Sequence, residues 1–431
     1  MSLASGVKHL MRTYASHRWD LQVEHAERPA FVSTRFNASD LTDLYDDNLD
    51  ADLAPWRARA AASPGGRLST PQLVDWARRV AGQGLRNEST LKLVMIKDGR
   101  LGFPLEDDKK GSLCPGYCDR LMEHLLKDLQ AWIKEEPEKW PNAVFLLNVL
   151  DMSMCAPPAR LQGKPEASSK VCSFPVLSLI KQWGSGRKDK DEDILVPLTT
   201  GKVDWTVDTF PFEHKVDRAV FRGRPYCHIK YDPWPWLTDN TCSRTYFSLQ
   251  HQASSEWKDH VDVGILTPDS TRKVVVDAKT RTVRGADFLP LREAARFRYT
   301  LNLDGITASS RLAKLLSLNS VVLKQESPWI EWYYRSLSPY GHYVPFWQHS
   351  RDDVLHVIDA LRAQPEDKLQ AIANKGQKFA YHYLRPEARK LYWRQALTEY
   401  RKLFGEDMDE YIDKQAVPEL PPANGRTARD W

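Results

Sequence analysis

Residues 298–346 constrain the fold most strongly, because short apolar runs and helical patterns alternate along them. The expected elements are strands at 298–303, 320–324 and 342–346, and helices at 308–318 and 329–337. An alternation of strands and helices predicts a parallel sheet with helices packed against it. Because a short strand at 219–221 begins the same pattern upstream, we place the start of a domain at residue 218.

A further parallel strand is expected at 143–150, where AVFLLNVL is a nearly continuous apolar run that ends at Asp151. Such a run is typical of a central strand that is covered on both faces. An amphipathic helix at 117–133 precedes it, and three more helices are expected near 351–363, 366–382 and 386–404. The predicted domains are an N-terminal extension (1–85), a first Rossmann-like α/β domain (86–217), a second one (218–384), a C-terminal helix (385–404) and a disordered tail (405–431).

The charge balance excludes some classes of function. The chain has 431 residues with 61 Lys and Arg against 57 Asp and Glu, and its 42% hydrophobic content is sufficient for cores in two or three domains. Because the net charge is only +4 and no basic stripe is evident, a nucleic-acid-binding protein is disfavoured, and a bound anion has to be held locally. No apolar stretch reaches the roughly 20 residues of a membrane-spanning helix, and no signal peptide is recognisable at the printed start.

The cysteines form three neighbouring pairs, separated by 4, 17 and 15 residues. They are Cys114 and Cys118, Cys155 and Cys172, and Cys227 and Cys242. Disulfides or buried thiols are favoured over zinc, because the Cys-Pro-Gly-Tyr-Cys segment has no second pair to complete four ligands. Disulfides would indicate an oxidising compartment, in conflict with the missing signal peptide.

The turn after the strand at 298–303 is a candidate anion site. Gly305 permits a tight turn, Thr307 is expected to cap the next helix, and the small residues that follow leave backbone amides open to a ligand. Arg311 lies in the first turns of that helix, where a positive charge is favoured only beside an anion. The candidate residues are Gly305, Ile306, Thr307, Ala308, Ser309, Ser310 and Arg311. The alternative is a surface arginine that pairs with a carboxylate.

Arginines also follow the strand at 219–221. Arg222, Gly223 and Arg224 end that strand, and Arg244 comes after a Trp-rich segment. Several guanidinium groups at strand ends could hold a diphosphate without a metal, because each matches phosphate oxygens through two hydrogen bonds. For any one of them alone, a structural ion pair is the alternative.

Asp151 is the candidate for acid–base chemistry. A carboxylate at the end of a buried parallel strand is positioned to take a proton from a bound hydroxyl group. The alternative is an Asp that stabilises the turn of its own Asp-Met-Ser segment.

The sequence resembles the CAP10-type glycosyltransferases (glycosyltransferase family 90), which include protein O-glucosyltransferases, over roughly residues 90–404. The most similar segment is FRYTLNLDGITASSRLAKLLSLNSVVLKQESPWIEWYYRSLSPYGHYVPFW at 297–347. AVFRG at 219–223 and FLLNVLD at 145–151 resemble two more segments of the family. The chain departs from the family pattern at Arg224, where the relatives have Ser, and in a longer stretch before Arg244 that contains YDPWPW at 231–236.

The resemblance implies a GT-B-like fold of two Rossmann-like domains that face a cleft. It implies an inverting transfer of glucose or xylose from UDP-glucose or UDP-xylose to a protein or glycan hydroxyl (EC 2.4 class), with no cofactor or metal. Asp151 would be the general base, and Arg244 with the turn at 306–311 would bind the diphosphate, with Arg222 and Gly223 alongside. The alternative is an inactive sugar- or nucleotide-binding module, which would have no use for the base.

The resemblance also implies a location in the secretory lumen, the endoplasmic reticulum or Golgi. For a luminal enzyme, Cys155–Cys172 and Cys227–Cys242 are the expected disulfides.

Overall fold

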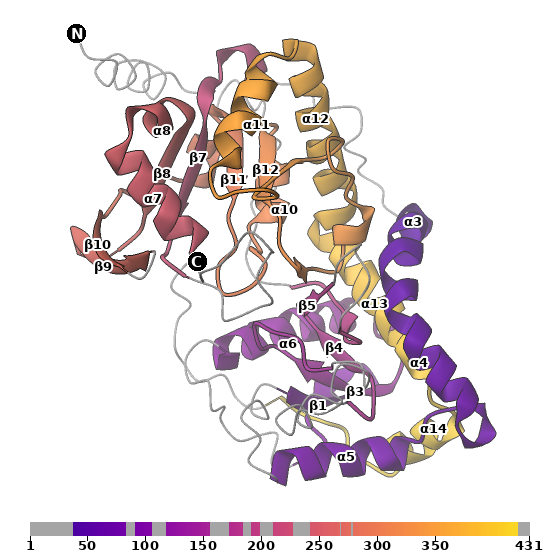
Figure 1. The fold of residues 1–431 in the computed structure, drawn as a ribbon. Helices are drawn as coiled ribbons and strands as arrows, with labels where there is room; N and C mark the ends of the chain where they lie inside the picture. Colours follow the sequence, from indigo (N-terminus) through magenta and orange to yellow (C-terminus); the bar gives the residue numbers. More distant parts are fainter. Residues whose placement is uncertain are drawn as a thin grey trace.

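The computed structural model describes residues 38–82, 91–105, 118–155, 172–183, 191–198, 210–226, 242–267, 269–276 and 279–420. Two five-stranded sheets with packed helices form the frame, one in residues 38–198 (the first half) and one in residues 210–384 (the second half). The C-terminal helices α13 (Pro386–Lys402) and α14 (Glu406–Asp413) return to the first half (Figure 1). The predicted α/β class is therefore confirmed.

The first sheet has the strand order β2-β1-β3-β4-β6. Its strands are β1 (Leu91–Lys97), β2 (Arg100–Gly102), β3 (Ala143–Asn148), β4 (Val176–Ser178) and β6 (Ile194–Leu195). β3, β4 and β6 run parallel, whereas β1 is antiparallel to both β2 and β3. Every residue of β3 is buried, as expected for the apolar run that predicted this strand. The predicted helix before it is α6 (Cys118–Glu135), and both elements are confirmed.

The second sheet is entirely parallel, with the order β14-β12-β11-β7-β8. Its strands are β7 (Val216–Gly223), β8 (Val261–Ile265), β11 (Phe297–Asn302), β12 (Val321–Gln325) and β14 (Val344–Phe346). One face packs on α7 (Ser243–Ala253), α8 (Ser255–His260) and α11 (Asp353–Arg362), and the other packs on α10 (Leu312–Leu316). From β7 the chain adds β8 on one side and β11 on the other, so the direction of winding reverses between β7 and β11.

One sequence prediction is wrong in this half, and two others differ from the structure in their bounds. The predicted helix at 329–337 is a short strand, β13 (Trp329–Ile330), followed by a helical turn, η11 (Tyr334–Ser336). Pairing of β13 with β5 (Lys181–Gln182) of the first half overrides the helical pattern, because it satisfies backbone groups that a helix would pair internally. The helix predicted at 308–318 is confined to α10, and β7 begins at Val216, so the predicted domain boundary at 218 lies inside a strand. The helices expected near 351–363, 366–382 and 386–404 are confirmed as α11, α12 (Glu366–Phe379) and α13.

Buried charges join the two halves through α4 (Ala51–Ala62). The Asp52 carboxylate is fully buried and lies 2.6 Å from Lys181 Nζ and 2.7 Å from Arg335 Nη2, which belong to different halves. Part of the predicted N-terminal extension is therefore integral to the core. Loss of the Asp52 carboxylate would remove an ion-pair partner from both cations, and breaking a buried pair in this way is strongly destabilising.

The predicted disorder of the tail from residue 405 is wrong for α14. Met408 and Ile412 of this helix are buried, and Asp407 accepts a hydrogen bond from the backbone amide of Thr70, at the start of α5 (Thr70–Gly82).

Within the described residues, no helix is long and apolar enough to cross a membrane. The remaining described elements are η1 (Ala38–Leu41), α3 (Thr42–Leu44), η2 (Tyr45–Asp50), η3 (Pro64–Gly66), η6 (Pro137–Lys139), η10 (Phe212–His214), β9 (Thr271–Val276), β10 (Lys279–Arg284), α9 (Leu291–Ala294) and η12 (Ala380–Leu384).

Candidate functional site

Two arginine side chains meet at the carboxyl ends of β7 and β11. Arg311 donates a hydrogen bond to the carbonyl oxygen of Arg222, which lies in β7. Arg244, in the first turn of α7, donates to the carbonyl oxygens of Leu303 at 2.9 Å and Arg224 at 3.1 Å. In open parallel sheets, ligands bind beyond the carboxyl ends of the strands where the winding reverses, and these guanidinium groups lie at that point.

The ring of Phe221 lies beside both guanidinium groups. The central carbon of Arg311 lies 5.1 Å from the ring centroid, and that of Arg244 lies 5.4 Å from it, both within the range of a cation–π contact. Gly223 and Gly305 permit this packing. A Cβ atom on Gly305 would approach Arg244 Nη2 to 3.1 Å, and one on Gly223 would approach the Phe221 ring to 2.6 Å. The two glycines of the sequence motifs therefore make room for the arginines and the ring.

Neither positive charge has a carboxylate within ion-pair distance among the described residues, although Asp304 and Asp151 act on Arg244 electrostatically. Neither Arg244 nor Arg311 forms an ion pair there, although Arg244 is only 6% exposed. Burial, followed by the charge of Arg311, lowers the pKa of Arg244 to about 10, and burial lowers the pKa of Arg311. Buried charges are usually paired, and guanidinium groups bind phosphate oxygens well. The pair therefore has the charge and geometry to accept an anion.

The other two arginines of the predicted clamp do not join this pair. Arg222 Nη2 lies 2.8 Å from the carboxylate of Asp262 on β8, so the structural ion pair, the alternative for each arginine, describes this side chain. Side chains alternate along a strand, which places Phe221 and Gly223 on the face opposite to Arg222. Arg224 is exposed, and its guanidinium donates to the Tyr226 hydroxyl at 3.3 Å. Both residues contribute backbone carbonyl groups to the site.

The expected helix cap at Thr307 is wrong. The helix after β11 begins only at Leu312, with Arg311 as its N-cap, because the intervening residues form turns. The amide of Ser309 donates to the Asp304 carboxylate at 3.3 Å, so it is not open to a ligand as expected. Ala308 is buried, Ile306 is half-buried and Ser310 is exposed. A helix N-terminus therefore does not contribute to the site, and the positive charge comes from the arginines.

The Thr307 hydroxyl instead donates a hydrogen bond to the carboxylate of Asp151. Asp151 follows β3 in the first half, so this contact brings the predicted base to the turn after β11. Burial raises the pKa of Asp151, while the Thr307 hydrogen bond and the charge of Arg244 oppose that rise. The structure thus brings Asp151, Thr307, Arg244 and Arg311 together.

Two further carboxyl groups, those of Asp304 and Glu331, interact electrostatically with one another, and Asp151 also acts on Glu331. Burial raises the pKa of Asp304 to about 6 and that of Glu331 to about 8. Both side chains are about 95% buried, whereas Asp151 is half-buried. Asp151 is therefore the carboxyl group of the three that a substrate can reach.

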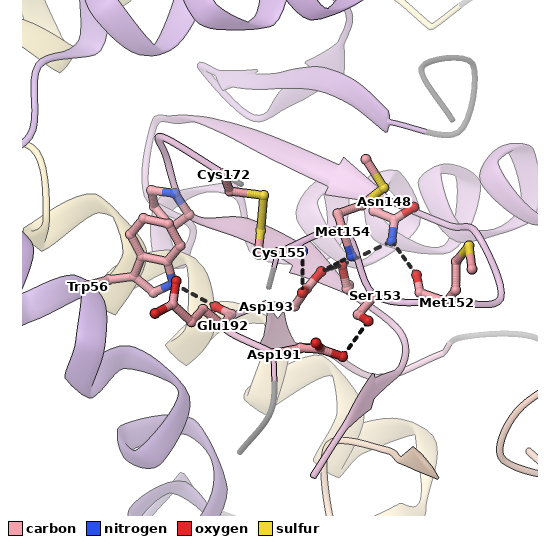
Figure 2. Close-up of a disulfide and its surroundings, with 12 residues drawn as sticks. Trp56, Asn148, Met152, Ser153, Met154, Cys155, Cys172, Asp191, Glu192 and Asp193 are labelled. Atoms are coloured by element: carbon pink, nitrogen blue, oxygen red, sulfur yellow. Dashed lines mark hydrogen bonds between the residues drawn. A yellow bond between two sulfur atoms is a disulfide. The ribbon is translucent and has the colours of Figure 1, made fainter. Parts of the chain in front are cut away.

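The turn that carries Asp151 is fixed by side chains on both sides of it (Figure 2). The Asn148 side chain accepts from the Leu150 amide at 3.0 Å and donates to the Met152 carbonyl at 2.9 Å. After the turn, the Asp193 carboxylate accepts from the amides of Met154 and Cys155, each at 2.8 Å. These bonds leave the backbone beside Asp151 little freedom.

A disulfide and a second carboxylate complete this support. Cys155 is bonded to Cys172, with 5.1 Å between their Cα atoms, which confirms that predicted pair. Asp191 accepts a hydrogen bond from the hydroxyl of Ser153 (Figure 2). It also accepts one from the amide of Gln182. Burial, followed by the charge of Asp191, raises the pKa of Asp193 to about 7. Cys242 is also disulfide-bonded, and its partner lies outside the residues whose side chains are described, as do Cys114, Cys118 and Cys227.

Sequence reasoning missed Phe221, Asn148 and Asp193. Phe221 stands directly before Arg222, and period-two alternation in β7 places it beside Gly223. Asn148 is a polar residue inside an apolar strand, which signals a buried hydrogen-bonding role. Asp193 stands at the end of a highly charged segment, GSGRKDKDED at 184–193, whose composition is typical of a solvated loop and gives no signal of a buried carboxylate; 184–190 lie outside the described residues. Among the residues that the structure describes, no three His, Cys, Asp or Glu side chains are grouped so that they could hold a metal ion.

The fold and this site define a doubly wound α/β protein with a polar site where its winding reverses. The chain belongs to Glycosyl transferase family 90, whose model matches residues 197–419, just over half of its length. The family predicted from the sequence is thus confirmed.

The chain is similar in sequence to several proteins that are named O-glucosyltransferases. Over 212 residues the chain is 32% identical to the O-glucosyltransferase rumi homolog of Anopheles gambiae. That alignment covers 48% of this chain and 45% of the relative. The chain is 26% identical over 196 residues to the rumi homolog of Aedes aegypti, with 46% and 44% covered. It is 29% identical over 187 residues to Protein O-glucosyltransferase 3 of Homo sapiens, with 43% and 32% covered. The aligned parts span less than half the length of these relatives.

Proposed function

We propose that this protein is an inverting glycosyltransferase that moves glucose or xylose from a UDP-sugar to a hydroxyl group of a protein or glycan. The observation that carries the proposal is the pair of guanidinium groups of Arg244 and Arg311, neither in an ion pair with a described carboxylate, near the carboxylate of Asp151, which Thr307 holds at the same turn. The guanidinium pair fits a leaving diphosphate, and the carboxylate fits a hydroxyl group that has to lose its proton. Family membership supports the same reaction class.

The chemistry divides between these groups. Asp151 takes the proton of the acceptor hydroxyl as the oxygen attacks the anomeric carbon of the sugar. The bond from that carbon to the diphosphate oxygen breaks on the opposite face, so the configuration inverts and UDP leaves with one more negative charge. Arg244 and Arg311 stabilise this charge by electrostatic attraction and hydrogen bonding. Because these arginines supply positive charge, we expect no metal requirement.

The proposed architecture is GT-B-like, with two Rossmann-like domains. The entirely parallel second sheet would bind the donor, and the first half would present Asp151. The relatives' names favour glucose as the sugar and a protein as the acceptor. The Cys155–Cys172 bond supports an oxidising compartment such as the secretory lumen, since disulfides persist there.

UDP release with a panel of UDP-sugars, with and without candidate acceptors, tests this function. We expect UDP-glucose or UDP-xylose to give UDP release that an acceptor accelerates, and EDTA to leave the rate unchanged. UDP binding without release from any donor would instead identify an inactive binding module. Complete loss of activity on chelation, restored by a metal, would contradict the metal-free mechanism.

A further inference from the structure

The hairpin of β9 (Thr271–Val276) and β10 (Lys279–Arg284) carries a concentrated positive charge. Residues 271–284 include five basic residues and one acidic residue, a net charge of +4 that equals the charge of the whole chain. All five basic side chains are exposed: Arg272, Lys273, Lys279, Arg281 and Arg284. None of the five forms an ion pair with a described residue. The hairpin is thus the kind of local basic surface that the overall composition hides.

The hairpin is attached to the elements that build the candidate site. The chain leaves β8 with the Leu266 amide donating to the carbonyl oxygen of Gly223, at 2.8 Å. It returns with the Ala286 amide donating to the carbonyl oxygen of Ile265, at 2.9 Å. The Gln252 side chain of α7 donates to the Arg284 carbonyl oxygen and accepts from the Arg284 amide. Both ends are therefore fixed at the carboxyl edge of the sheet (Figure 1).

The hairpin is held in place by its apolar side chains. Val274, Val276 and Val283 are buried in the same core as Phe247 and Trp257 of the helices beside the sheet. The exposed basic residues thus stand on a supported ribbon rather than on an isolated loop. Phe288, which follows the hairpin, is 72% exposed and adds an aromatic ring to this surface.

We infer that this surface, the β9–β10 hairpin with Phe288, docks an acidic segment of the polypeptide acceptor. The inference rests on the proposed function and specifies the acceptor. Each strand of the hairpin pairs only with the other among the described residues, so the edges offer backbone groups to an extended peptide. Arginine and aromatic side chains are enriched in protein interfaces, and positive charge complements Asp and Glu. A lipid surface or a glycan lacks the regularly spaced amide and carbonyl groups that pair with a strand edge.

Peptide binding to the full chain tests the inference. The probes are a fluorescent peptide of repeated Asp, Ser and Leu and its neutral analogue of repeated Asn, Ser and Leu. We expect the acidic peptide to bind more tightly, with an affinity that falls as salt is added. The combined change Arg272→Gln, Lys279→Gln and Arg281→Gln is expected to weaken its binding about tenfold, since exposed charge pairs contribute modestly. Phe288→Ser should weaken it as well, and Phe288→Tyr should not.

The matched control removes three exposed lysines of α12, by Lys368→Gln, Lys375→Gln and Lys378→Gln. It changes the net charge equally and should leave peptide binding unchanged. Equal affinity for both peptides, or equal loss in both triple variants, would overturn the inference. Hairpin-dependent binding of heparin fragments or of phosphatidylserine vesicles, but not of the peptide, would overturn it too.

The donor side is measured on the same variants. UDP affinity should be unchanged in the hairpin variant, because the Arg244 and Arg311 side chains are intact. Absence of UDP binding by the unaltered chain would contradict the proposed function. The peptide measurements would test the docking surface independently of that result.

Discussion

The hydroxyl of Thr307 donates a hydrogen bond to the carboxylate of Asp151. The two residues are far apart in sequence, and each follows a strand of a different sheet. Their contact couples the candidate base to the turn that leads to Arg311. The hydrogen bond orients the Asp151 carboxylate and favours its charged form, as the proposed role of a base requires.

Replacement of Thr307 is predicted to shift the pH dependence of transfer. A hydrogen bond to a carboxylate favours the charged form, so Thr307→Val removes a contribution that lowers the pKa of Asp151. Because the base must be deprotonated, the acid limb of kcat/KM should move to higher pH by about one unit. Thr307→Ser, which keeps the hydroxyl, should restore the original profile. An unchanged profile in the valine variant would mean that Asp151 is not the titrating base.

Asp151→Asn is predicted to lower kcat at least about a hundredfold, because loss of a general base typically costs 10² to 10⁴ in rate. UDP affinity, measured by titration calorimetry, should be retained because the proposed diphosphate ligands Arg244 and Arg311 are intact in this variant. A rate near that of the unaltered chain, at saturating acceptor, would assign the base elsewhere.

Arg244→Ala and Arg311→Ala are predicted to weaken UDP binding and to slow transfer together. Each removes charge-assisted hydrogen bonds, which contribute about 1.5–3 kcal/mol each, so we expect at least about a tenfold loss of affinity. Arg311→Lys should restore only part of it, because an ammonium group lacks the planar fork of donors. The control is Arg224→Ala, which removes an exposed guanidinium group and keeps the backbone carbonyl that holds Arg244. Equal losses in all three alanine variants would contradict the proposed site.

The positions of the strands at 143–150 and 298–303 follow from the sequence, because buried apolar runs are local signals. The positions of Asp151 and the arginines near these strand ends made them candidates, whereas their roles as base and diphosphate ligands came from the family resemblance. The roles of the four arginines could not be separated, since only the fold shows that Asp262 pairs with Arg222. Such a pairing depends on which strands are neighbours in the sheet.

Other differences have a comparable physical origin. The segment at 329–337 has a helical pattern of apolar residues, whereas the pairing of β13 with β5 is a contact between distant segments that a local pattern does not show. The helix start at Thr307 was misplaced because small residues fit a turn as well as a first helical turn. α14 was missed because its helical signal is short and its stability comes from packing Met408 and Ile412.

Stability is predicted to fall as the pH rises through neutrality. Burial raises the pKa of Asp193 from 3.8 to about 7 in the folded chain, so folding favours its protonated form. Its contribution is therefore fully present below the unfolded pKa and is lost as the pH rises towards 7. Asp304 and Glu331 act in the same direction. The melting temperature should be lower at pH 8 than at pH 6, and Asp193→Asn should reduce that difference. An identical slope in the variant would contradict the assigned titration of Asp193.

Removal of the Cys155–Cys172 bond is predicted to lower both stability and turnover. The bond joins residues separated by 17 positions, and a loop of that size corresponds to about 3 kcal/mol of stabilisation in the chain-entropy account. In the double variant Cys155→Ala and Cys172→Ala, the Cys155 end of the turn after Asp151 is held only by hydrogen bonds, chiefly to Asp193. We therefore expect a lower midpoint in urea and a lower kcat, whereas UDP affinity should stay the same because Arg244 and Arg311 lie in the other half. A lower midpoint with unchanged kcat would show that the disulfide stabilises the fold without positioning Asp151, and lost UDP affinity would show that the donor site depends on this bond.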